Sequence, residues 1–113
     1  MLLALDKHDA LYIYESPMEA ERDLDAIDVQ QDAMEFCDSD GQNYLPVFTI
    51  PPKTSKLGPF GIVDIGAFRL SPQDAAEPKN VDRFLERAAH IEHTSVPGIS
   101  TIEALKKTLR KKL

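Results

Sequence analysis

A short strand pattern that leads directly into a helix start signal constrains the fold of this chain most. The run from Ala10 to Tyr14 is apolar and aromatic throughout, which is typical of a strand buried on both faces. Ser16 then supplies a capping hydroxyl, Pro17 fits the first helical position, and Glu19 can complete a capping box. We therefore predict a strand followed by a helix from about Pro17 to Ile27.

Alternating segments farther along the chain predict a hairpin. Both Ala33–Cys37 and Asn43–Ile50 alternate between apolar and polar residues, and the polar segment Asp38–Gln42 separates them. Because Pro46 has no backbone N–H to donate, we expect its strand to lie at a sheet edge or to contain a bulge. The proline-containing segment 51–59 is expected to form a loop. A long strand is predicted over 60–70, where Gly61 and Gly66 indicate a bend or bulge.

The C-terminal third predicts two helices. A wide apolar stripe between Lys79 and Glu92 favours one long helix, and the segment 94–98 would end it. Ser100 and Glu103 frame a second capping box, so a helix is expected from there to near the C-terminus. The stripe of the longer helix consists of Val81, Phe84, Leu85, Ala88 and Ile91.

The predicted order is therefore β-α-β-β-β-α-α. We expect one α+β domain over residues 1–113, with a mostly antiparallel sheet of about four strands covered on one face by about three helices.

Length and cysteine content bound the class of protein. A chain of 113 residues can bury a core without disulfides, and its single cysteine, Cys37, excludes an internal one. We interpret Cys37 as a buried structural residue. The N-terminal apolar run has no basic flank and is too short for a signal peptide, and no segment is long enough to span a membrane. A cytoplasmic location is expected.

Charge is distributed unevenly along the sequence. Residues 1–42 contain twelve acidic and two basic residues, so this part carries −10. Residues 43–113 carry eleven basic and seven acidic residues, or +4, which gives the whole chain its net −6. Such a surface attracts a basic protein. The candidate partner-binding carboxylates are Glu19, Glu21, Asp23, Asp25, Asp28, Asp38 and Asp40.

Two alternative functions depend on other residues. On one continuous helix, Glu86, His90 and His93 would share a face and could hold a zinc ion, as in a small metal-dependent enzyme or accessory protein. The basic C-terminal helix, with five cations from Lys106 to Lys112, could instead bind nucleic acid. A solvated helix face explains either pattern as well.

No phosphate-binding loop, nucleophile motif, paired-cysteine site or dinucleotide fingerprint is found in the sequence, so we expect no cofactor and no catalysis. In size, charge and cysteine content the chain resembles small bacterial α+β proteins of unknown function, including immunity proteins that block a basic toxin. The most distinctive stretch of this resemblance is Leu11 to Glu21. The resemblance implies a non-catalytic module that binds a basic protein.

Overall fold

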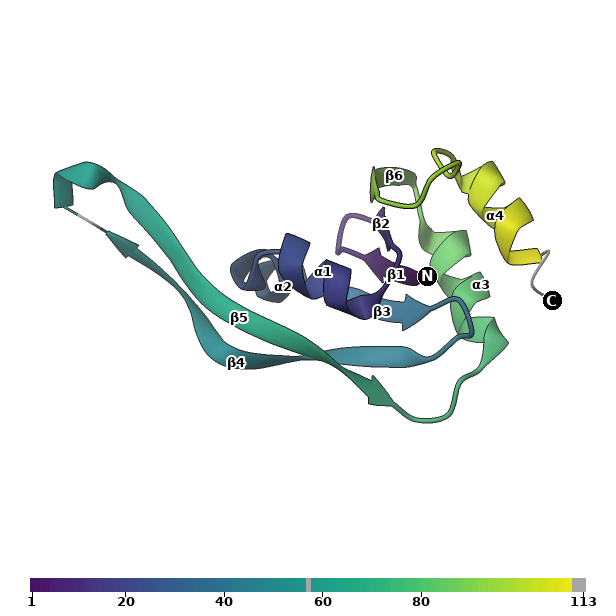
Figure 1. Cartoon of the computed structure of the whole chain (residues 1–113), viewed down its shortest axis with the longest axis horizontal. Coiled ribbons are helices and arrows are strands. Elements are labelled where there is room, and N and C mark those ends of the chain that lie inside the picture. Colours follow the sequence, from purple (N-terminus) through teal and green to yellow (C-terminus); the bar gives the residue numbers. More distant parts are fainter. Residues whose placement is uncertain (57, 111–113) are drawn as a thin grey trace.

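Two helical layers enclose a mixed sheet (Figure 1). The computed structural model describes residues 1–56 and 58–110, and within them the sheet has six strands in the order β5-β4-β3-β1-β2-β6. Its strands are β1 (Leu2–Leu5), β2 (Ala10–Tyr14), β3 (Glu35–Asp38), β4 (Asn43–Lys56), β5 (Ile62–Gln73) and β6 (His90–Thr94). Four α-helices accompany them, α1 (Pro17–Asp23), α2 (Ala26–Gln31), α3 (Pro78–Arg87) and α4 (Ile102–Arg110), with a 3-10 turn η1 (Gly58–Phe60). No helix in these ranges is long and apolar enough to cross a membrane.

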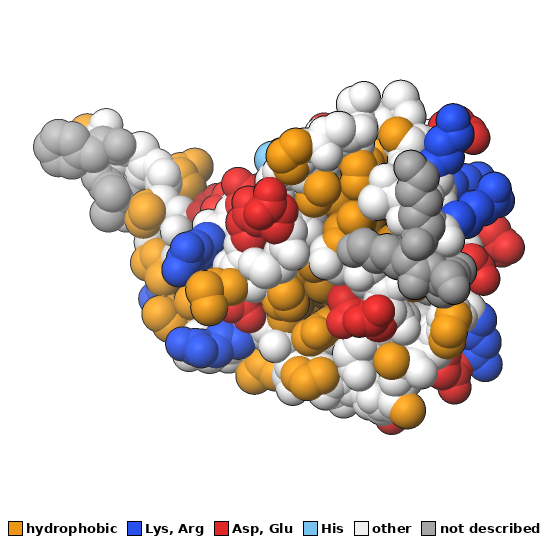
Figure 2. Space-filling view, turned by 45° about the vertical axis from the view of Figure 1, so that its right-hand side comes forward, with side chains coloured by type: hydrophobic (Ala, Val, Ile, Leu, Met, Phe, Trp, Pro, Cys, Tyr) orange, Lys and Arg blue, Asp and Glu red, His pale blue; other side chains and the backbone are white. Residues whose placement is uncertain are grey.

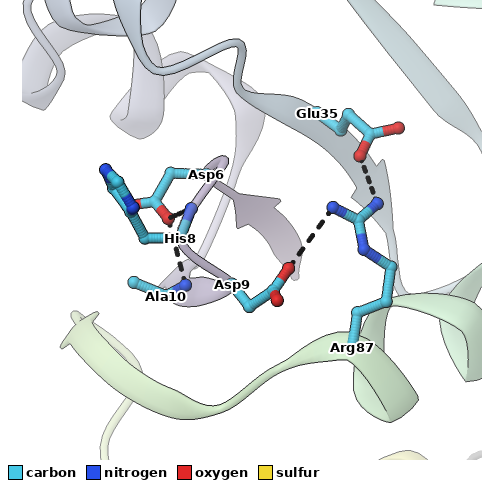
Figure 3. A network of polar contacts seen from close by, with 6 residues as sticks. All are labelled: Asp6, His8, Asp9, Ala10, Glu35 and Arg87. Atoms are coloured by element: carbon cyan, nitrogen blue, oxygen red, sulfur yellow. Dashed lines mark hydrogen bonds and ion pairs between the residues drawn. The ribbon is translucent and has the colours of Figure 1, made fainter.

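The central strand β1 is absent from the predicted elements. All four of its residues are fully buried, and it pairs antiparallel with both β2 and β3. Four apolar residues at the N-terminus show no period, so the pattern gave no strand signal. The turn from β1 to β2 is closed by the buried carboxylate of Asp6, which accepts hydrogen bonds from the backbone N–H groups of His8 and Ala10 (Figure 3).

Helices cover both faces of the sheet, so the prediction of a single helical layer is wrong. One face of the central strands packs with α1 and α2 through Leu2, Ala4 and Tyr14. The other face packs with α3 and α4 through Leu3, Leu5 and Ile13. Strands that are apolar on both faces need cover on both. The α+β class is confirmed, while the sheet is larger than expected and is not purely antiparallel.

The first predicted helix is divided into two short ones. Leu24 has an extended backbone, with φ −86° and ψ 136°, which ends α1 before α2 begins at Ala26. Half of the predicted capping box is present, since Ser16 Oγ accepts from Glu19 N. The Glu19 carboxylate accepts from Glu15 N, one residue before the cap, where a capping box would place this bond on Ser16 N. Leu24 itself packs against the core, so the break keeps the apolar stripe buried while the chain changes direction.

The long helix predicted from Lys79 to Glu92 ends at Arg87 and is followed by a strand. β6 runs parallel to β2, and the backbone N–H groups of Ala89 and Ser95 bond to carbonyl oxygens of Asp9 and Ile13. Ile91 contributes to the same core cluster as Leu85 in spite of this change. The apolar spacing is therefore compatible both with one long helix and with a helix followed by a strand. Pairing with the edge of β2 favours the strand.

The β4–β5 ribbon is longer than predicted. β4 continues to Lys56 through the segment expected to be a loop, and β5 continues to Gln73, beyond the expected end of its strand at residue 70. Pro46 lies beyond the pairing of β4 with β3, which ends at Tyr44, and two bulges follow it, so both predicted features of its strand are present. Gly66 lies across from the second bulge, where a Cβ would be 2.9 Å from that of Ala26 and would push α2 away.

Candidate docking surface

A two-stranded arm extends from the body of the molecule. Beyond Tyr44, β4 has only β5 as a neighbouring strand in the described structure, and the ribbon projects well past α2 (Figure 1). We call residues 45–56 and 62–71 the arm. The longest axis of the molecule, 53 Å against 29 and 22 Å for the others, reflects this projection.

Strand pairing assigns the arm side chains to two faces. Cross-strand partners share a face and successive residues alternate. Phe48, Phe68 and Leu70 point to the core with α1 and α2. Each of the two bulges adds one residue to β4, which returns Ile50 and then Lys53 to the opposite face. The pairs on that opposite face are Leu45–Ser71, Val47–Arg69, Ile50–Ala67, Lys53–Ile65 and Ser55–Val63.

Five aliphatic side chains on this second face are exposed to solvent. We call them the arm stripe: Leu45, Val47, Ile50, Val63 and Ile65, which are 56, 50, 50, 36 and 37 % exposed. Figure 2 shows hydrophobic side chains along the arm with Lys and Arg side chains beside them. Contiguous exposed apolar surface of this kind marks an interaction site more often than a solvated face.

The arm stripe is exposed because the second helical layer stops short of it. The core cluster beneath α3 and α4 takes its strand residues from β1, β2, β3 and β6, and none from the arm. A hollow of about 270 Å³ lies where this layer ends, lined by Leu45, Glu35, Asp74 and Arg83 among others. The stripe thus runs from this hollow outward along the ribbon.

The predicted partner-binding carboxylates divide into two groups. Five of the seven belong to the α1–α2 segment, and three of these have structural roles. Glu19 accepts from Glu15 N at the start of α1, Glu21 accepts from Leu70 N at the outer edge of β5, and Asp23 accepts from Tyr14 Oη. Burial first, and then the hydrogen bond to Asp23, raises the pKa of Tyr14.

The remaining pair of this segment, Asp25 and Asp28, lies in a concentrated negative field. Burial first, and then the charges of Asp25, Asp32 and Asp64, raise the pKa of Asp28. Asp64 comes from the outer half of the arm, where it pairs with Thr54, so the arm and α2 both contribute to this negative field. A cationic group would be stabilised here.

Asp38 and Asp40 lie in the β3–β4 turn, away from the acidic cluster of α2. The carboxylate of Asp38 accepts from Asp40 N, Gln42 N and Tyr44 Oη, so it holds the turn together. Asp40 lines a cavity of about 380 Å³ between α3 and α4, opposite Lys106 and Arg110. The acidic first part of the chain and the basic C-terminal helix therefore meet in the fold.

The structure does not bring Glu86, His90 and His93 together. Glu86 belongs to α3 and lines the cavity beside α4, whereas both histidines belong to β6. His90 pairs with Glu92, and His93 stacks on Tyr14 with a ring-centroid distance of 5.1 Å. Within residues 1–56 and 58–110, no three His, Cys, Asp or Glu side chains are grouped as metal ligands. The shared helix face assumed for this site is wrong.

The basic helix and Cys37 occupy the places that the sequence suggests. α4 presents Lys106 and Arg110 toward the carboxylates of Asp82 and Glu86 across the cavity, while Lys111 and Lys112 lie outside the described residues. Cys37 is fully buried in the sheet, as predicted. Burial first, and then the charge of Asp38, raises the pKa of its thiol to about 12, which disfavours a nucleophilic thiolate.

Sequence reasoning missed the arm stripe as a candidate site. The alternation in 43–50 and 60–70 predicted the strands, but nothing in it shows which face stays uncovered.

No protein-family model, no curated protein and no solved structure matches this chain. Its function therefore has to be inferred from its own geometry.

Proposed function

We propose that this chain is a non-catalytic protein-binding module and that the arm stripe is its docking surface. The observation that carries the proposal is the exposure of five aliphatic side chains on one face of a ribbon that projects from the body. Exposed aliphatic residues on a rigid, hydrogen-bonded ribbon can enter an interface without the cost of ordering a loop.

The size of the stripe supports an energetically useful contact. Burying the exposed part of each side chain, between about a third and a half of it, contributes about 1 kcal/mol, so the five residues together contribute about 5 kcal/mol. This gain is near the lower end of the cost of association, which is about 4–15 kcal/mol. A partner therefore has to add polar or charged contacts around the stripe.

The acidic cluster of Asp25, Asp28, Asp32 and Asp64 supports a second contact within the same function. A basic protein would be attracted to it, and this charge would mainly speed association. An inhibitor of the immunity type, which docks on a basic toxin, is the form of the proposal that gives this cluster a role.

Capture from a lysate of the source organism tests the arm. Replacing Val47 and Ile50 by aspartate places two charges in the stripe, and we expect the proteins retained by the wild-type chain to be lost from this variant. The matched control is Ala75→Asp with Ala76→Asp, which adds the same charges to an exposed loop off the arm. Mass spectrometry compares the three eluates, with far-ultraviolet circular dichroism confirming that all three baits are folded. Identical eluates from all three baits would refute the arm as docking surface.

A further inference from the structure

The uncovered face of the arm carries charge of one sign. Arg69 lies opposite Val47, and Lys53 lies opposite Ile65, so both cations flank the arm stripe. The carboxylate of Asp64 belongs to the other face, where it accepts from Thr54 Oγ1. Among the described residues of the arm, the stripe face therefore holds two cations and no carboxylate. This is unusual in a chain of net charge −6.

The two cations are separated by the apolar centre of the stripe. Arg69 and Ile65 are four residues apart on β5, which corresponds to about 13 Å along an extended strand. Lys53 lies opposite Ile65, so its distance from Arg69 along the ribbon is similar. The Ile50–Ala67 pair occupies the space between them. A ligand that satisfies this face needs two anionic groups with aliphatic side chains between them.

The face of the arm is better suited to docking than its edges. Strand addition at the outer edge of β4 needs backbone N–H donors, but Pro46, Pro51 and Pro52 lack them and bulges interrupt the ladder. On the edge of β5 the carboxylate of Glu21 already accepts from Leu70 N at 2.8 Å. A partner that docks on the face of the arm therefore contacts side chains and not backbone hydrogen-bonding groups.

We infer that the arm stripe binds an acidic, aliphatic segment of a partner protein, with two carboxylates about 13 Å apart that pair with Lys53 and Arg69. In an extended segment this spacing corresponds to acidic residues at positions i and i+4 with an aliphatic residue at i+2. The inference rests on the proposed function and specifies its partner. The arm would thus bind acidic groups, whereas the acidic cluster at α2 would attract basic groups.

The same charges argue against two other occupants. A second copy laid face to face would place Lys53 and Arg69 near their own equivalents, which is repulsive. Nucleic acid requires many phosphate contacts, whereas the described part of the arm has three cations, Lys53, Lys56 and Arg69, around an aliphatic stripe without stacked aromatic rings.

Selection of a random peptide library displayed on phage, with the full chain immobilised, tests the inference. We expect selected peptides to be enriched in Asp or Glu four residues apart around an aliphatic residue. Lys53→Glu with Arg69→Glu should weaken their binding about tenfold, because two charge pairs are lost. The same variant should instead select peptides rich in Lys and Arg. Lys79→Glu with Lys106→Glu is the matched control, since both lysines lie off the arm.

Each other outcome has a defined meaning. Peptides that bind the arm without preference for acidic residues would overturn the charge inference and leave the proposed function standing. Peptides that bind the Val47→Asp/Ile50→Asp variant equally well would refute both. Fluorescence anisotropy with labelled single- and double-stranded DNA, and sedimentation velocity of the chain alone, complete the test. Binding to DNA or dimerisation that disappears in either arm variant would overturn the acidic-protein partner.

Discussion

Replacing Gly41 by alanine is expected to lower the free energy of unfolding by about 3 kcal/mol or more, because two costs add. Gly41 has φ +86°, a left-handed conformation that L side chains rarely adopt, and its Cβ would overlap the carbonyl group of Glu77. The carbonyl oxygen of Gly41 also accepts from Glu77 N and Asn80 Nδ2, so the β3–β4 turn anchors the start of α3. Displacing this turn would therefore disturb the second helical layer. Urea denaturation of the variant measures the change.

Gly98→Ala separates the two costs. Gly98 also has a positive φ, +80°, but nothing lies within 4 Å of the position of its Cβ. We expect this control to lose only about 1–2 kcal/mol, the cost of the backbone conformation. Equal losses in the two variants would show that the contact between the turn and α3 does not exist in solution.

Asp6→Ala is expected to be similarly damaging, with a loss of about 3 kcal/mol, because it removes charge-assisted hydrogen bonds inside the protein. The buried carboxylate accepts from His8 N at 2.8 Å and from Ala10 N at 3.1 Å (Figure 3). It also accepts from Tyr12 Oη at 3.1 Å. Without it, the N–H of Ala10 is left buried beside the central strands. Chemical denaturation measures the loss, and amide exchange should increase first at the β1–β2 turn.

Two variants define how the carboxylate of Asp6 acts. Tyr12→Phe removes only the hydroxyl bond and should cost about 1 kcal/mol. Asp6→Asn keeps an acceptor oxygen and should cost less than Asp6→Ala. If the alanine and asparagine variants are equally unstable, the charge of Asp6 and not its backbone bonds stabilises the turn.

Arg87 connects this turn to the rest of the fold. Its guanidinium pairs with Asp9 beside the β1–β2 turn and with Glu35 on β3 (Figure 3). The hydrogen bond to Glu35 is the main cause of the raised pKa of Arg87. All three side chains are about 40 % exposed or more, so solvent screens the pairs and they contribute little to stability. They fix the orientation of α3 as it passes into β6.

Local signals in the sequence predicted the elements that begin or end at a capping residue, a polar turn or a proline. The Ser16 cap, the polar turn at 38–42 and the bulges in the strand that contains Pro46 are all present in the structure. Elements decided by tertiary pairing were missed. β1 is a four-residue apolar run, and β6 follows a helical apolar spacing, so both depend on the exposed edges of their neighbours. The second helical layer was missed for the same reason.

The candidate site could not be predicted from sequence because it exists only where no helix covers the sheet face of the arm. Val47 and Phe48 are adjacent apolar residues of β4, yet Val47 is half exposed and Phe48 packs against the core. Only the position of the helices distinguishes them. The spacing of Glu86, His90 and His93 illustrates the opposite failure, since a shared helix face was assumed for residues that lie on a helix and a strand.

Carbene footprinting of the complex recovered by capture tests the central claim most directly. A photoactivated diazirine labels accessible aliphatic side chains, and mass spectrometry locates the labels in the free and bound chain. Docking on the arm stripe predicts that Leu45, Val47 and Ile50 lose most of their label on binding, while Met18 on α1, which is 58 % exposed, keeps it. Unchanged labelling of the stripe, with protection confined to the helices, would contradict the assignment of the arm as the docking surface.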